Sequence, residues 1–247
     1  MEGRGWPADE AEETAMFLGH FGAAFVLKRL EPKLSLGTLF FAVQLPDILW
    51  GAFLLRGWEQ VRIDPGYTDV TPLQFIDYPI SHGLLGMAGW SLALAAVYYS
   101  WPTRDTSRHW QAAVLVGLAV LSHYPLDLIV HVPDLPLDGG SPVRLGLGLW
   151  NHRVATLLLE LASFAAGAAI YVALRSTRHP VRAGRLAGLA AILVAIYLVS
   201  FFGPPPPSVT AIAAADIVGL LLLVALAAWA DRRATPAELA SARAKAR

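Results

Sequence analysis

Seven residues that can bind metal ions or transfer protons lie inside or at the ends of long apolar segments of this 247-residue chain. Ionisable side chains are costly in apolar surroundings, so a group of them marks a candidate functional site. Because the sequence has no cysteine, a metal site must be built from His, Asp and Glu, which suit zinc and related divalent ions. The candidate ligands are His20, Asp47, His82, His123, Asp127, His131 and His152.

The strongest local pattern is the segment HYPLDLIVH, in which His123, Asp127 and His131 stand at i, i+4 and i+8. In a helix this spacing places the three side chains on one face, each about 6 Å along the axis from the next. Two side chains four residues apart can converge on one ion. Such a pair can also be a structural contact in which the carboxylate fixes the imidazole tautomer. Because seven such residues converge, we favour a metal site over a structural contact.

The segments that carry these residues are apolar enough to cross a membrane. The chain is 55% hydrophobic and 15% charged, with a mean hydropathy of +0.50, which exceeds what a soluble domain of this length carries. A span needs about 20 mostly apolar residues. We therefore expect an all-α integral membrane protein, a bundle of about seven transmembrane helices within residues 15–230. The expected spans are 15–30, which is short and carries His20 and Lys28, then 34–55, 79–99, 110–130, 147–174, 186–202 and 209–230.

The basic residues are unevenly distributed between the two sides of this seven-span arrangement. Fourteen of the nineteen lysines and arginines fall in loops on one side and four on the other. The positive-inside rule then places segment 1–14 outside and the basic tail 231–247 in the cytoplasm. All seven candidate ligands lie towards the outer face. We expect a protein of a bacterial or archaeal cytoplasmic membrane whose site faces outside, with loops 56–78 and 131–146 as lids or binding loops.

Three further polar residues lie in the apolar segments. We interpret Glu160 and Asp216 as structural or supporting acids, because each stands apart from the candidate ligands. Arg153 can pair with an acid or bind a phosphate, since its planar guanidinium suits both.

Four motifs, GHFGAAFVLKRL, LFFAVQLPDILWG, DYPISHGLLG and LSHYPLDLIVH, resemble a known family in their order. This family consists of membrane-bound metal-dependent hydrolases related to the LexA-binding inner-membrane hydrolase. The family is distantly similar to zinc-dependent phospholipase C and the P1-type nucleases. The resemblance covers about residues 17 to 155. It implies that His82, His123 and Asp127 are core ligands, with Asp127 able to bridge two ions. It also implies that Asp47 is a ligand or general base and that His20 binds a second ion.

The resemblance is incomplete at a third ion. His131 and His152 can match two later histidines of the soluble phospholipases, but position 156 is Thr where those enzymes have an acid. Their free N-terminal Trp amine is also missing here. We therefore expect one or two divalent ions, with zinc as the expected metal.

The resemblance implies hydrolysis, and the chemistry of the residues agrees with it. A divalent ion lowers the pKa of its water from 15.7 to about 7, and Asp47 can accept the proton. The depth of the site favours a membrane lipid or another amphiphile as substrate, with a phosphoester as the bond cleaved. We expect no nucleic-acid partner.

Two other classes of protein use similar residues. A metal-ion or proton transporter also carries intramembrane His and Asp, but needs polar groups through the whole thickness. A haem-binding electron carrier needs paired axial histidines, whereas the carboxylates beside these histidines favour hard divalent ions. A retinal protein is excluded because none of the three lysines, Lys28, Lys33 and Lys245, lies in segment 209–230.

Overall fold

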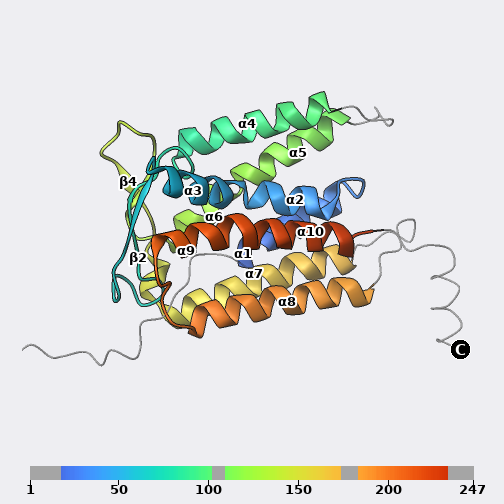
Figure 1. Ribbon diagram of the computed structural model, residues 1–247. Coiled ribbons are helices and arrows are strands. Elements are labelled where there is room, and N and C mark those ends of the chain that lie inside the picture. Colours follow the sequence, from blue (N-terminus) through green and yellow to red (C-terminus); the bar gives the residue numbers. More distant parts are fainter. Residues whose placement is uncertain (1–17, 102–108, 174–182, 233–247) are drawn as a thin grey trace, which may run out of the picture.

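The computed structural model describes residues 18–101, 109–173 and 183–232, so segment 1–14 and most of the tail 231–247 lie outside the described residues. Each of the seven apolar segments forms helix, and the helices run side by side along a common direction (Figure 1). The helices are α1 (Leu18–Leu30), α2 (Leu36–Val43), α3 (Leu45–Arg56), α4 (Leu84–Ser100), α5 (His109–Leu121), α6 (His123–Val130), α7 (Arg153–Ala173), α8 (Ala183–Phe202), α9 (Val209–Ala214), the π-helical η2 (Ala215–Gly219) and α10 (Leu220–Ala230).

The prediction of seven membrane spans is wrong. Among the described residues, four helical stretches are long and apolar enough to cross a bilayer: His109–Val130, Arg153–Ala173, Gly184–Phe202 and Val209–Ala230. Helices α2 and α3 add a fifth only if the two halves, bent by 51°, count as one span. Helix α4 has 17 residues and α1 has 13. At 1.5 Å per residue α1 is about 20 Å long, well short of the roughly 30 Å hydrocarbon core.

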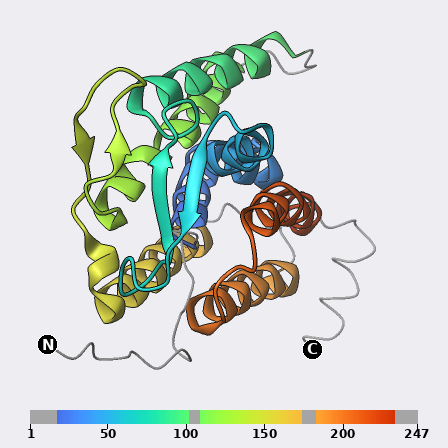
Figure 2. The ribbon, with the colours of Figure 1, turned by 60° about the vertical axis from the view of Figure 1, so that its left-hand side comes forward.

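Helix α1 is apolar because other helices cover it. Most of its side chains are buried, and it lies between α7 and α2 (Figure 2). Its closest approach is to α7, where a methyl group added at Gly22 would stand 2.6 Å from the carbonyl oxygen of Ser163. Glycines allow helices to approach closely in this way. Hydropathy could not separate a helix covered by protein from one covered by lipid.

Three of the helical passes are irregular at the same end of the bundle. The pass α2–α3 bends at Gln44, two residues before Pro46, which lacks the N–H needed to continue the helix. The pass α5–α6 is interrupted at Ser122, three residues before Pro125. The last pass contains the π-helical turn η2, a feature that is frequent at functional sites.

Two small antiparallel hairpins stand at this end, which we call the hairpin end (Figures 1 and 2). Strand β1 (Gln60–Ile63) pairs with β2 (Leu73–Asp77), so that Ile63 lies opposite Leu73. Strand β3 (Leu135–Pro136) pairs with β4 (Arg144–Leu145). These hairpins lie in the two long loops expected from the sequence. The first follows directly from the C-cap of α3, Gly57, whose φ of 69° is readily adopted only by glycine.

Candidate metal centre

Five of the seven predicted site residues meet at the hairpin end, and we call them the His/Asp cluster. His20 comes from α1, Asp47 from the first turn of α3, His82 from the turn before α4, and His123 and Asp127 from α6. Asp127 Oδ1 lies 3.3 Å from His20 Nε2, and Asp127 Oδ2 lies 3.1 Å from His123 Nε2. Asp47 Oδ1 lies 3.2 Å from His82 Nε2 and 3.6 Å from His123 Nε2.

The cluster contains two overlapping groups that could hold a metal ion. One consists of His20, His123 and Asp127, and the other of Asp47, His82 and His123; in each, the ligand atoms lie within 4.8 Å of one another. The two oxygens of Asp127 face opposite sides, one towards His20 and the other towards His123 and His82. This is the arrangement that a bridging carboxylate needs.

A side-chain acceptor, Ser81 Oγ, fixes the ring orientation of His82. Its Nδ1 lies 2.8 Å from Ser81 Oγ, and that hydroxyl donates to Glu59 Oε2 at 2.6 Å. Because the hydroxyl proton is used on Glu59, Ser81 Oγ accepts from His82 Nδ1–H, and Nε2 keeps its lone pair for the cluster. Glu59 also accepts from the backbone N–H groups of Ile80 and Ser81 at 2.8 Å each.

His123 is oriented by the break between α2 and α3. Its Nδ1 lies 2.8 Å from the carbonyl oxygen of Val43, the last residue of α2. A carbonyl accepts only, so Nδ1 carries the proton and Nε2 presents its lone pair to Asp47 and Asp127. The bend beside Pro46 thus serves the site directly, because it frees the acceptor that orients this ring.

The cluster contains buried polar atoms whose hydrogen-bonding capacity is unused. Within the described residues, neither ring nitrogen of His20 nor Asp127 Oδ2 has a hydrogen-bond partner, although all three are shielded from solvent. Unpaired buried polar atoms cost free energy and are rare. His123 Nε2 and Asp127 Oδ2 are both acceptors and point at one another, as expected where a cation belongs, so the residues fit a metal ion.

Glu160 fixes the position of α1, as expected of a supporting acid. Its side chain is fully buried, and Oε2 accepts from the backbone N–H of Gly19 at 2.6 Å. Helix N-termini leave their first N–H groups unpaired, and a carboxylate there is favourable. The bond ties the start of α1 to α7 next to His20.

His131 lies beside the cluster but in neither ligand group. Its Nδ1 lies 2.8 Å from Asp134 Oδ1, which also accepts from the hydroxyl of Tyr78 at 3.0 Å. Burial and the neighbouring Asp134 carboxylate raise the pKa of the Tyr78 phenol well above its usual value, so Tyr78 remains a donor. Nδ1 of His131 is therefore occupied, and Nε2 is the nitrogen left for other partners.

The structure does not bring His152 into the cluster. Its side chain is exposed, and its backbone carbonyl accepts from Thr156 Oγ1 at 3.2 Å. The physical reason is the short 3-10 turn η1 (Leu149–Asn151), which ends at His152 before α7 begins. Sequence reasoning had continued one helix through this point.

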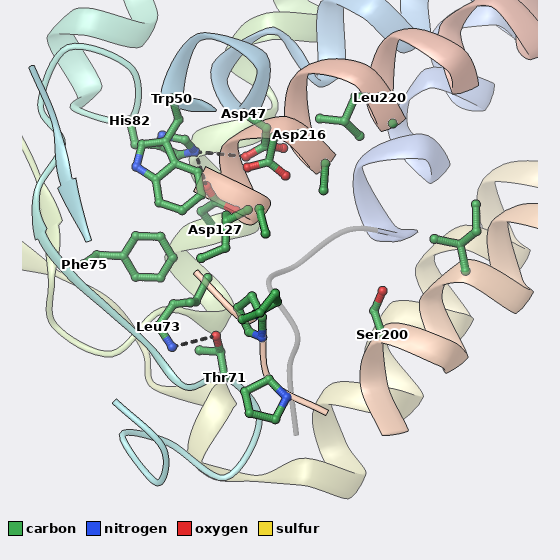
Figure 3. Close-up of a pocket in the computed structure, with 18 of the residues that line it drawn as sticks. Asp47, Trp50, Thr71, Leu73, Phe75, His82, Asp127, Ser200, Asp216 and Leu220 are labelled. Carbon is green, nitrogen blue, oxygen red and sulfur yellow. Dashed lines mark hydrogen bonds and ion pairs between the residues drawn. The ribbon is translucent and has the colours of Figure 1, made fainter. Parts of the chain in front are cut away.

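A cavity of about 540 Å³ opens from the His/Asp cluster. Asp47, His82, Asp127 and His131 line its polar part, and Trp50 and Phe75 flank them (Figure 3). Asp216 of η2 also lines it, and Figure 3 shows its carboxylate next to that of Asp47. The Asp47 side chain is 21% exposed, whereas those of His82, His123 and Asp127 are at most 4% exposed. Asp47 is therefore the member of this set most accessible from the cavity.

No protein-family model, curated protein or solved structure matches this chain. The family resemblance therefore rests on the four sequence motifs, and the function has to be inferred from the geometry of the site.

Sequence reasoning missed the residues that orient the ligands. Glu59, Ser81, Asp134 and the Val43 carbonyl were not among the candidates. Glu59 lies 22 residues from Ser81, and Val43 lies 80 residues from His123, so no periodicity links them. The available signal was each candidate histidine itself. A ligating imidazole almost always donates its second N–H to an acceptor, so each one predicts a nearby acceptor.

Proposed function

We propose that the protein is a membrane-embedded, divalent-metal-dependent hydrolase that cleaves a phosphoester of a lipid or another amphiphile at the outer interface of the membrane. The observation that carries this proposal is the convergence of three imidazoles and two carboxylates on one end of a cavity, with buried lone pairs that lack hydrogen-bond partners within the described residues. Mixed His and Asp ligands favour zinc.

The residues of the cluster divide into two roles. His20, His82, His123 and Asp127 are buried and would hold the ion, which when bound polarises a phosphoryl oxygen and lowers the pKa of a water to about 7. Asp47 borders the cavity and would accept the proton of that water. The Gln44 amide, in its hydrogen-bonded orientation, donates to Asp47 Oδ2 at 3.2 Å and keeps Oδ1 turned towards the histidines.

The opposite end of the bundle favours the hydrolase over a transporter. There, Lys28 Nζ binds Asp231 Oδ2 at 2.8 Å and also donates to the carbonyl oxygen of Pro32 at 3.0 Å. The Lys28 and Asp231 side chains are each 7% exposed. This ion pair closes the contact between α1 and α10, which a conducting path along these helices would have to open.

The geometry also disfavours a haem carrier. The rings of His20 and His123 have centroids 3.7 Å apart at 79°, so they are in van der Waals contact. Two axial ligands need an iron and a porphyrin plane between them. These two rings leave no such space.

The test uses the purified full chain reconstituted in vesicles of phosphatidylglycerol and phosphatidylethanolamine and loaded with zinc. Release of water-soluble phosphorus compounds is followed by phosphorus NMR. We expect Asp47→Asn to keep most of the metal while the rate falls by roughly 10²- to 10⁴-fold, the range for loss of a general base. We expect Asp127→Ala to lose metal and activity together.

Asp77→Asn is the matched control, because Asp77 is an exposed carboxylate at the same end and lies outside both ligand groups. It should retain the parent's rate and metal content. The proposal fails if the zinc-loaded parent releases nothing from these vesicles, or if Asp47→Asn hydrolyses them at the parent's rate.

A further inference from the structure

We infer that the apolar part of the cavity binds the hydrocarbon tail of the substrate, and that the tail enters sideways from the bilayer between α8 and the pass α9–η2–α10. This inference rests on the proposed function for the identity of the head group. The tail site itself is argued from the shape and chemistry of the cavity.

The cavity is polar at one end and apolar along the rest of its length. Beyond the carboxylates, its walls are Ile196 of α8, Ile212 of α9, and Leu220 and Leu223 of α10. Leu223 lies seven residues beyond Asp216, which corresponds to about 10 Å along the helix axis. The cavity therefore runs from the His/Asp cluster towards the middle of the bundle, in the direction that a lipid tail takes from its head group.

The mouth of the cavity lies on the apolar flank of the bundle. Ile196 lines the cavity and is nevertheless 38% exposed, so the wall that it forms also faces the surroundings. It stands six residues before the end of α8 at Phe202, about 9 Å below that end. An opening at this depth meets hydrocarbon in a bilayer.

The first hairpin and a proline turn border the end of the cavity nearest the water. Thr71, Leu73 and Phe75 of the first hairpin line it (Figure 3), and Pro204 to Pro207, which connect α8 with α9, also line the cavity. Thr71, Leu73 and Phe75 are all buried. The first hairpin therefore closes this part of the cavity, and the lining that reaches the surface lies along α8 and the proline turn.

The close packing of α3 on η2 joins the two parts of the cavity. A methyl group at Gly51 of α3 would stand 2.9 Å from the carbonyl oxygen of Ala213 and 3.3 Å from Asp216 Cβ. The approach places Asp216 beside Asp47 at the boundary between the polar and apolar walls (Figure 3). The head group and the first carbons of the tail would meet at this boundary.

The test uses a hexadecyl phosphonate that carries a photoreactive diazirine at the far end of its chain. Its carbon–phosphorus bond resists phosphoester hydrolysis, so labelling reports binding alone. With the zinc-loaded full chain in vesicles, we expect the crosslinks to fall on the α8 and α10 segments around Ile196, Leu220 and Leu223. Unlabelled hexadecyl phosphonate should compete, and butyl phosphonate should not.

Two α8 variants sharpen the result. Ile196→Trp fills the mouth of the cavity and should reduce labelling by roughly tenfold, because the larger side chain occupies space that the tail needs. Val199→Trp adds the same side chain at a position that is 72% exposed and outside the cavity lining, and should label like the parent. Both variants should retain the metal content of the parent.

Crosslinks confined to the outer surface of α4, or equal labelling of Ile196→Trp and the parent, would overturn the tail site. If the protein hydrolyses no phosphoester but the probe still labels α8 and α10 competitively, the proposed function fails and the tail site stands. If hydrolysis of vesicle lipids is found but the labelling pattern is not, the tail site fails alone.

Discussion

At the scale of the residue, the chemistry of the His/Asp cluster depends on which ring nitrogen carries the proton. In His82 and His123, Nδ1 is bonded to Ser81 Oγ and to the Val43 carbonyl, and Nε2 is left for the cluster. Partners of this kind fix the tautomer and raise the basicity of the ligand. The metal affinity of the site should therefore depend on residues that never touch the ion.

Ser81→Ala tests this dependence. The change removes the hydroxyl that links His82 Nδ1 to Glu59 and leaves a buried carboxylate without one of its donors. We expect zinc affinity to fall by roughly 10- to 100-fold. Competition with a chromogenic zinc chelator measures it.

Ser91→Ala is the control for this variant. Ser91 is also a buried serine, but its hydroxyl donates to the carbonyl oxygen of Gly117 at 2.7 Å, away from the cluster. Its loss should leave zinc affinity unchanged. Equal affinities of Ser81→Ala and the parent would show that Ser81 does not orient the ligand.

At the scale of the element, most of the site lies on short or interrupted helices. His20 lies on the 13-residue α1, and Asp47 follows the bend between α2 and α3. Irregular backbone at membrane depth is tolerated where protein buries it or where it lines a cavity. The bend leaves the Val43 carbonyl to accept from His123. The helix α6, which follows the interruption at Ser122, presents His123 and Asp127 on one face.

The position of His20 should depend on the contact between α1 and α7. Gly22→Ala would drive a methyl group into the backbone of Ser163, so we expect α1 to shift and the protein to lose about 1–3 kcal/mol of stability. Zinc content should fall with it. Thermal unfolding in detergent and metal analysis measure the two effects.

Gly89→Ala is the matched control, because a methyl group there would meet nothing within 4 Å among the described residues. In the middle of α4 it should be neutral or stabilise by up to about 1 kcal/mol. If Gly22→Ala unfolds and binds zinc like the parent, the α1–α7 contact does not position His20.

The sequence was informative about the residues and their grouping, and less so about the elements that hold them. The depth of His20, Asp47, His82, His123 and Asp127 in their segments predicted one end of a helical bundle, and the structure brings them together there. The number of spans was not predictable, because hydropathy cannot distinguish the protein-covered α1 from a lipid-covered helix. The place of His152 depended on a turn at Gly148, whose φ of 74° redirects the chain before α7.

At the scale of the whole molecule, the two ends of the bundle differ in chemistry. The hairpin end carries the cluster and the cavity, whereas Lys28, Arg29, Arg185 and Arg232 lie at helix ends on the opposite side (Figure 1). Arg56, Arg62, Arg144 and Arg153 lie at the hairpin end, so the orientation rests on the fourteen-to-four count over the whole sequence and on the positive-inside rule. The orientation stays a prediction, and the lack of cysteine makes it directly testable.

Single cysteines at Gly140 and Arg232 should react from opposite sides of the membrane. Both positions are exposed, the first in the loop between β3 and β4 and the second after α10. In intact cells, a membrane-impermeant maleimide should label Gly140→Cys, and Arg232→Cys should react only after permeabilisation. The reverse pattern would place the site on the cytoplasmic face.

The metal content of the purified chain tests the central claim most directly. Protein extracted in detergent without chelator is analysed by inductively coupled plasma mass spectrometry beside Asp127→Ala and Asp77→Asn. We predict about one or two divalent ions per chain in the parent and in Asp77→Asn, and loss of the metal in Asp127→Ala, because the buried ion loses a charged ligand. A parent without stoichiometric metal, or an Asp127→Ala variant with the metal content of the parent, would contradict the account and leave the His/Asp cluster as a helix-packing contact.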